Sequence, residues 1–207
     1  METRTYNVYT FQEASDKLKE KILEKYRQSK YEHGFVYASE YIDSLNAFVK
    51  STGIQLRDYC LGSGASYTGI QWSYESYNWD FDVDSISGLK LRTWLLNNWV
   101  CNWEKGKYYH SNSTNSKGLY RWRRSKIQKT IECPFTGCCY DHDLIQPILD
   151  FIKKPNNHTT LRCIIDECFD NFITAYNEDE ECQYSDDAII ETIYMNEYMF
   201  KENGEID

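Results

Sequence analysis

Apolar residues recur at helical spacing over several stretches of this chain, and this periodicity restricts the fold more than any other feature. Between positions 161 and 176, one helical face would carry Phe169, Phe172 and Tyr176. Similar apolar stripes predict further helices over residues 16–26, 40–50, 89–103, 144–152 and 186–195. We therefore expect helices to make up most of the core.

Four short segments have the alternation typical of strands, and they cover residues 6–11, 54–61, 67–75 and 197–201. The two middle segments flank a glycine-rich turn and predict a β-hairpin, in which we expect Trp72 and Tyr74 to be buried. The sequence thus predicts an α+β fold. In it, a small antiparallel sheet of the N-terminal strand, the hairpin and the C-terminal strand packs against several helices.

We expect residues 1–207 to form a single domain, with residues 85–142 as a basic, cysteine-bearing, loop-rich insertion. Charge is distributed unevenly around a net value of −9. Residues 105–131 hold eight lysines and arginines and no acid. Residues 163–207 hold fourteen acids, with Lys201 as the only base. The two segments either face each other or each face a partner.

The densest acidic residues are candidates for binding a partner, because closely spaced carboxylates resemble a phosphate backbone. These residues are Glu178, Asp179, Glu180, Glu181, Asp186 and Asp187. The alternative is a solvated charged face that keeps the protein in solution.

The basic segment 117–129 combines guanidinium groups with an indole, a mixture that grips phosphates and stacks on bases. Its candidate residues are Lys117, Arg121, Trp122, Arg123, Arg124 and Lys126. One alternative function is therefore a nucleic-acid-binding module. The same residues would also suit an acidic protein surface or the acids of the C-terminal segment.

The densest group of potential metal ligands consists of Cys133, Cys138, Cys139 and His142. Thiolates and imidazoles are the ligands that zinc prefers, so these residues are candidates for a zinc site. A metal-dependent enzyme centred on residues 133–143 is a second alternative. The competing interpretation is buried thiols, with Asp141 or Asp143 capping a helix that starts near Leu144. We expect no catalytic residue elsewhere and no cofactor besides such a zinc ion.

The sequence favours the cytoplasm. No apolar run approaches the ~20 residues that a membrane-spanning helix needs, and positions 1–9 lack the pattern of a secretion signal. We therefore expect the eight cysteines to be reduced.

The two ends of the chain carry a series of recognisable motifs. A short strand precedes a helix that starts at Ser15 and Asp16, a glycine-centred turn follows at Gly62, and a strand with Asn196, Glu197 and Tyr198 leads into an acidic tail. These motifs resemble those of a family of small acidic proteins encoded by bacteriophages and prophages. The resemblance covers the first third and the last fifth of the chain, and residues 85–139 depart from it. It implies a gene used during infection, in the cytoplasm of a bacterial host.

Accessory phage proteins of this size often disarm host defences, including CRISPR effectors. Eighteen tyrosines also favour a contact surface. The leading interpretation is therefore a phage-encoded inhibitor or modulator of a host defence or nucleic-acid-processing complex. Such a protein would act by stoichiometric binding to a host protein or nucleoprotein complex. If its acidic residues make the contact, they would imitate the phosphates of a nucleic acid.

Overall fold

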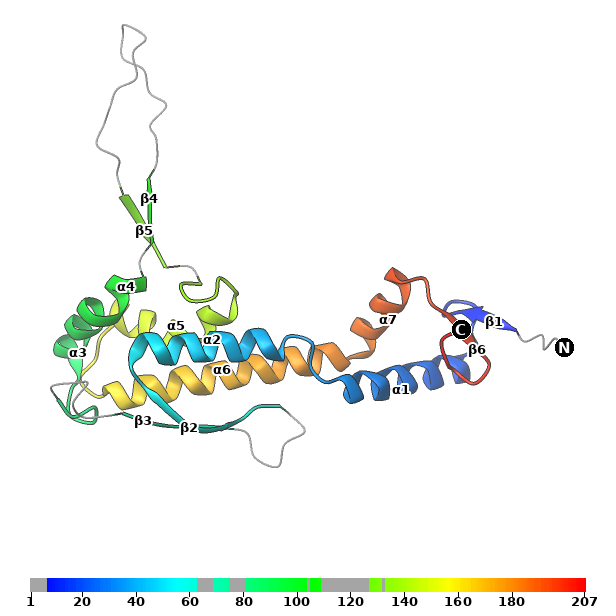
Figure 1. Cartoon of the computed structure of the whole chain (residues 1–207), viewed down its shortest axis with the longest axis horizontal. Coiled ribbons are helices and arrows are strands. Elements are labelled where there is room, and N and C mark those ends of the chain that lie inside the picture. Colours follow the sequence, from blue (N-terminus) through cyan, green and yellow to red (C-terminus); the bar gives the residue numbers. More distant parts are fainter. Residues whose placement is uncertain (1–6, 63–68, 75–80, 104, 109–126, 132) are drawn as a thin grey trace, which may run out of the picture. The chain divides into compact units, whose positions relative to one another are not determined.

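Two compact units divide the chain. The computed structural model describes residues 7–62, 69–74, 81–103, 105–108, 127–131 and 133–207. The terminal unit comprises Met1–Ser39, Leu61–Ser66 and Tyr176–Asp207, and the central unit comprises Glu40–Cys60 and Tyr67–Ala175 (Figure 1). The expectation of a single domain over residues 1–207, with an insertion at 85–142, stays a prediction.

The terminal unit joins the two ends of the chain. Its elements are β1 (Val8–Thr10), α1 (Asp16–His33), the last part of α6 (Leu161–Tyr184), α7 (Asp186–Met195) and β6 (Met199–Lys201). Strands β1 and β6 pair antiparallel, with Tyr9 opposite Phe200. The segments that carry the resemblance at the two ends therefore lie side by side (Figure 1).

Helix α1 follows the apolar stripe of the sequence. Leu18 and Ile22 are buried and Tyr26 is half-buried, as the four-residue spacing predicts. The helix ends at Gly34, whose φ of 78° is a conformation that glycine adopts without strain. The core that α1 shares with α7 and β6 consists of Phe11, Ala14, Leu18, Ile22, Ile189, Ile193 and Phe200.

The central unit is built mainly from helices. It contains most of α2 (Ala38–Thr52) and of α6, together with β2 (Gln55–Cys60), β3 (Gly69–Ser73), α3 (Gly88–Leu95), η2 (Leu96–Val100), α4 (Cys101–Trp103), β4 (Lys105–Tyr108), β5 (Ile127–Thr130) and α5 (Tyr140–Lys153). Aromatic contacts join α2 to α6: the ring centroids of Phe48 and Phe169 are 5.9 Å apart, and those of Tyr41 and Phe172 are 5.3 Å apart. Periodicity alone identified these buried faces.

Helix α5 contains a proline, Pro147, in its interior. Proline has no N–H, so the carbonyl of Asp143, four residues earlier, loses its helical hydrogen bond. The side chain of Asn171 on α6 replaces that donor, with its Nδ2 2.7 Å from the Asp143 carbonyl oxygen. The contact repairs the break and also ties α5 to α6.

The strands confirm the α+β class but not the expected topology. They form separate two-stranded sheets, β1 with β6, β2 with β3 and β4 with β5, all antiparallel. The expectation that the N-terminal strand, the hairpin and the C-terminal strand share one sheet is wrong. The reason is that β1 and β6 cover the core of α1 and α7, whereas the hairpin belongs to the central unit.

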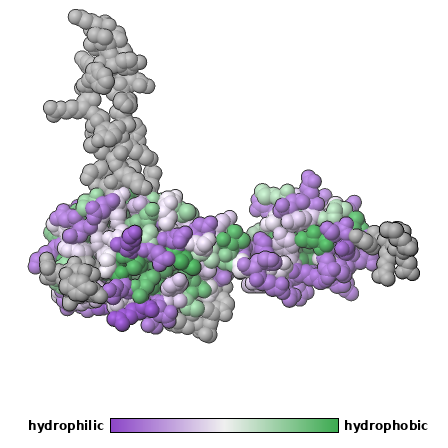
Figure 2. Space-filling model, in the orientation of Figure 1, coloured by the Kyte–Doolittle hydropathy of each residue, from purple (hydrophilic) through white to green (hydrophobic). Residues whose placement is uncertain are grey.

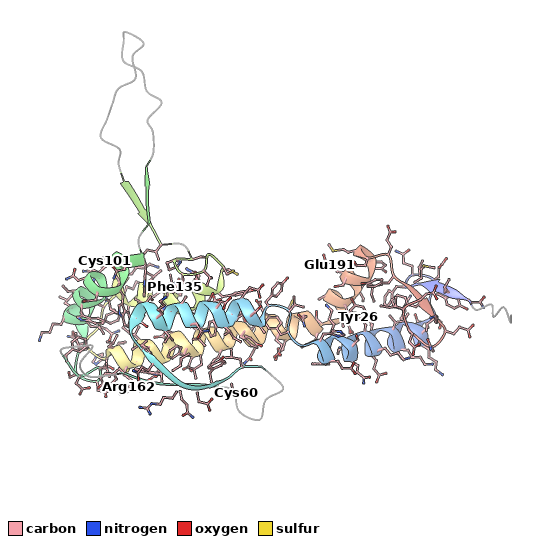
Figure 3. All side chains as sticks on the ribbon, in the orientation of Figure 1. Tyr26, Cys60, Cys101, Phe135, Arg162 and Glu191 are labelled. Carbon is pink, nitrogen blue, oxygen red and sulfur yellow. The ribbon has the colours of Figure 1, made fainter. Side chains whose placement is uncertain are left out.

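Trp72 and Tyr74 are half-buried, so the expectation that helices largely bury them is wrong. The hairpin lies along the outer surface of α6, where Trp72 Nε1 donates to Asp166 Oδ1 at 2.7 Å. The guanidinium of Arg162, a residue labelled in Figure 3, lies over the Trp72 ring. It is 5.1 Å from the centre of that ring. The Trp72 ring also contacts Phe169 of α6, with the ring centroids 6.4 Å apart, so Trp72 is held against α6 while remaining half-buried.

The helix predicted over residues 89–103 is present as α3, η2 and α4 in succession, with a π-helical turn over Leu96–Val100. Three tryptophans form a chain along it: Trp94 and Trp99 have centroids 5.2 Å apart, and Trp99 and Trp103 6.1 Å apart. Over the described part of the chain, no helix is both long enough and apolar enough to cross a bilayer.

Candidate functional site

An acidic surface lies on two consecutive helices of the terminal unit. Its predicted residues are Glu178, Asp179, Glu180 and Glu181 near the end of α6, and Asp186 and Asp187 in the first turn of α7. All are exposed except Glu180, which is half-buried. Figure 2 shows the visible face of this unit as mostly hydrophilic, with a smaller hydrophobic area.

The end of α6 is an unfavourable place for negative charge. The last turn of α6 carries no basic residue. Because the carbonyl end of a helix already has a partial negative charge, carboxylates near it are repelled rather than attracted. The helix dipole therefore does not explain why Glu178 and Glu181 occur at this end of α6.

Asp186 and Asp187 differ, because the first turn of a helix attracts negative charge. Asp186 also forms an ion pair with Arg27 of α1, and Arg27 Nε donates to the Tyr184 carbonyl at 3.0 Å. Asp186 therefore has a structural role within the unit. The structure places all six predicted acids on neighbouring turns but gives Asp186 this internal partner.

Aromatic rings support the acidic surface from within the unit. Tyr184 stacks on Tyr31 with centroids 4.0 Å apart, and Tyr176 meets Phe35 edge-on at 5.0 Å. Burial, and then the negative charge of Glu180, raises the pKa of both Tyr176 and Tyr184. Both hydroxyls are therefore neutral at physiological pH.

The segment before α5 is organised by Asp141, which is fully buried. Its carboxylate accepts hydrogen bonds from the N–H groups of Phe135 and Thr136, both at 2.8 Å, and of Gly137 at 3.2 Å. The Thr136 hydroxyl donates to the other carboxylate oxygen at 2.9 Å. This geometry supports the structural interpretation of Asp141, although it holds the loop before α5 rather than capping a helix at Leu144.

The predicted metal ligands lie in that loop and in the first turn of α5. Cys133 and Cys138 are half-buried, and Cys139 and His142 are exposed. Within the described residues, no three His, Cys, Asp or Glu side chains gather closely enough to hold a metal ion. Zinc at this position and a metal-dependent enzyme centred on residues 133–143 stay predictions.

The eight cysteines are all free thiols, and only Cys168 is buried. The interpretation of Cys133, Cys138 and Cys139 as buried small residues is therefore wrong, because the loop that carries them lies at the surface. Burial raises the pKa of the Cys168 thiol well above its ordinary value. That thiol is consequently neutral and unreactive in the folded protein.

The candidate basic residues Lys117, Arg121, Trp122, Arg123, Arg124 and Lys126 lie outside the described residues. What is described is the pair of strands that flanks them. Lys105 of β4 lies opposite Thr130 of β5, and Tyr108 lies opposite Ile127. The two segments that flank the basic residues are therefore paired as neighbouring antiparallel strands.

Sequence reasoning missed the side chains that fix α1 against the end of α6. Besides Arg27, Gln183 holds the turn after α1: its Oε1 accepts from the Val36 N–H at 3.0 Å and its Nε2 donates to the Gly34 carbonyl at 3.3 Å. Arg27 and Tyr31 stand four residues apart on one helical face, which was an available signal. Their partners were missed because helix 161–176 was expected to stop before Tyr184.

Comparison of the chain with models of protein families, with curated proteins and with solved structures finds no match.

Proposed function

We propose that the protein is a phage-encoded inhibitor or modulator of a host defence or nucleic-acid-processing complex in the bacterial cytoplasm, and that it acts by stoichiometric protein binding. In this proposal the acidic surface makes the contact. The resemblance of the chain ends to phage and prophage proteins supplies the host context.

The observation that supports the proposal is the run Glu178, Asp179, Glu180 and Glu181 near the end of α6. The exposed Glu178 and Glu181 of this run work against the helix that carries them, because the carbonyl end of a helix repels negative charge. Charge kept at a cost to local stability is typical of a binding surface, because selection for function tolerates such a cost. The aromatic packing of Tyr176 and Tyr184 beneath the run holds the helix in place.

A surface of this kind would recognise a basic channel that normally receives nucleic acid. Closely placed carboxylates present negative charge that attracts lysines and arginines, as phosphates do. Long-range attraction also speeds association, and salt weakens it beyond a screening distance of ~10 Å at 0.1 M ionic strength. Binding should therefore weaken steeply as salt is raised.

The proposal can be tested by affinity capture from a bacterial lysate. The bait would be the full chain or a variant in which Glu178, Glu180 and Glu181 become Gln and Asp179 becomes Asn. A matched control would neutralise four exposed acids elsewhere in the same unit, Glu20, Glu24, Glu32 and Glu202, to Gln. Both variants change the net charge equally.

We expect the wild-type chain and the control to retain the same protein partner and the α6 variant to lose it. Surface substitutions usually change stability by about 0.5 kcal/mol or less, so all three proteins should remain folded. Equal capture by the α6 variant and the wild-type chain would contradict the assignment of the contact to this surface. Capture lost equally in both variants would show that only net charge matters.

A further inference from the structure

A groove of about 660 Å³ opens on the terminal unit, between one face of α1 and the chain from Tyr198 to Ile206. Tyr26, Tyr198 and Phe200 form its floor, and Ile206 forms part of its rim. Tyr26 projects from α1 in Figure 3. None of the acids of the proposed contact lines this groove.

One side of the groove is the edge of a β-sheet. On the side of β6 away from β1, the Lys201 N–H donates to the Glu205 carbonyl and the Asp207 N–H donates to the Met199 carbonyl, both at 2.9 Å. Phe200 and Ile206 are therefore directly opposite each other without hydrogen bonds between them.

In such a pair the N–H and C=O of each residue point away from the other strand. The main-chain groups of Ile206 therefore point outwards from β6. No hydrogen bond to either group is formed among the described residues. An edge of this kind is a template onto which an extended segment can add as a further strand.

The floor of the groove suits an apolar side chain. The rings of Tyr26 and Tyr198 lie 6.3 Å apart at an interplanar angle of 43°. Burial, with a smaller effect of the Tyr198 hydroxyl, raises the pKa of Tyr26, so this hydroxyl is a neutral hydrogen-bonding group. At the rim, Val36 is 66% exposed and Ile206 is 43% exposed, which leaves apolar surface for a partner to cover.

The charge of the groove is opposite to that of the protein as a whole. Its charged lining residues are Lys25, Lys30 and Glu205, with His33 beside them. Glu205 is held by Lys25, with Nζ and Oε1 3.0 Å apart. Lys30 lies 5.7 Å from the centre of the Tyr26 ring and meets no carboxylate among the described residues, so it can receive one from a partner.

We propose that this groove binds an extended peptide segment of a partner protein, which pairs with the edge at Ile206, places an apolar side chain against Tyr26 and Tyr198, and sets a carboxylate on Lys30. Alternate side chains of a strand point the same way, so the apolar residue and the acid would stand two positions apart. The inference stands on contacts separate from the acidic surface.

The test is selection of a random peptide library against the full chain, followed by measurement of the affinities of the enriched peptides. We expect enriched peptides to combine an apolar residue with an acid two positions away. Ile206→Pro removes the outward N–H, and Lys30→Glu reverses the charge. Each should weaken binding roughly tenfold or more, which corresponds to ~1.4 kcal/mol.

Matched controls are Ile206→Val, which keeps the N–H, and Lys17→Glu, which reverses an exposed charge of α1 outside the groove. Both should bind the enriched peptides as the wild-type chain does. A second measurement does not depend on the fold of any variant: N-methylation of the peptide at the pairing residue should also weaken binding.

The same selection would be run on a variant that carries both Ile206→Pro and Lys30→Glu. The proposal would be overturned if no peptide is enriched more strongly on the wild-type chain than on this variant. It would also be overturned by enriched peptides whose affinity is unchanged by Lys30→Glu and by N-methylation. Neither result depends on the acidic surface of α6, so the two proposals fail separately.

Discussion

Gly88 has a left-handed backbone conformation and lies close to the side chain of Asn157. Its φ is 60°, and a Cβ at this position would collide with Oδ1 of Asn157. Its N–H also donates to the Asn156 carbonyl at 3.0 Å. The start of α3 is thus packed directly against the chain that leads into α6.

Replacing Gly88 by alanine should therefore destabilise the protein by more than backbone strain alone. Gly53→Ala is the matched control, because Gly53 has a φ of 75° but a Cβ there would meet nothing within 4 Å. We expect Gly53→Ala to cost ~1–2 kcal/mol and Gly88→Ala clearly more. Chemical denaturation of both variants measures the difference, and equal losses would show that the Asn157 contact yields easily.

Asp141 is the residue at which sequence and structure can be compared most directly. A buried carboxylate that accepts several hydrogen bonds is costly to remove, because its donors are left without partners. Its role depends on the amides of Phe135, Thr136 and Gly137, which lie in an aperiodic loop. The spacing of residues along the sequence therefore could not decide between a helix-capping role for Asp141 and a metal site in the same segment.

Asp141→Ala should lower the free energy of unfolding by about 2–4 kcal/mol. His142→Ala, one position away but exposed, should change it by about 0.5 kcal/mol or less. Denaturation in the presence and absence of a zinc chelator measures both. If the His142 variant is destabilised as strongly, and the chelator lowers the stability of the wild-type chain, the metal hypothesis is the better one.

At the scale of elements, helices were the most predictable part of the fold. The apolar stripe of α7 predicts its observed bounds, Asp186–Met195. Ser185 at the N-cap accepts a hydrogen bond from the Ala188 N–H at 3.3 Å. Helix α6 continues eight residues past the predicted end because its acidic tail has helix-forming residues but no apolar period. The predicted hairpin is confirmed, because β2 pairs with β3. The pairing of β1 with β6 could not be predicted, since three-residue strands carry too little pattern to specify a distant partner.

The bond between Asn171 and the Asp143 carbonyl is a contact between two helices that a double-mutant cycle can measure. Asn171→Ala should cost ~0.5–1.5 kcal/mol in the wild-type background. With Pro147→Ala, the new N–H can donate to the Asp143 carbonyl, so the same substitution should then cost less. An unchanged cost in the Pro147→Ala background would contradict the replacement of a helical bond by Asn171.

Over the whole molecule, cysteine side chains are found in both units, and they differ in exposure. Cys182 is exposed in the terminal unit, while Cys60, Cys101, Cys139 and Cys163 are exposed in the central unit. Cys168, with its raised pKa, is the buried exception. The sequence predicted reduced cysteines but could not say which one the core encloses, because that depends on how α5 packs on α6.

Thiol labelling of the freshly prepared protein should modify Cys168 only after denaturation. The five exposed cysteines should react in the native state, and the unfolded chain should yield all eight. Mass spectrometry of labelled peptides identifies each site. Rapid labelling of Cys168 in the native protein would contradict its enclosure, and a shortfall in the denatured total would point to disulfides or retained metal.

The pairing of Val8 with Lys201 has a consequence for how the chain is made. Ribosomes add about 5–20 residues per second, so β1 waits roughly 10–40 s for β6 to be synthesised. During that time the apolar stripe of Leu18 and Ile22 is without Ile189, Ile193 and Phe200. We therefore expect the apolar face of the N-terminal helix to stay uncovered during translation. Because closing so long a loop costs conformational entropy, we also expect the terminal unit to fold late.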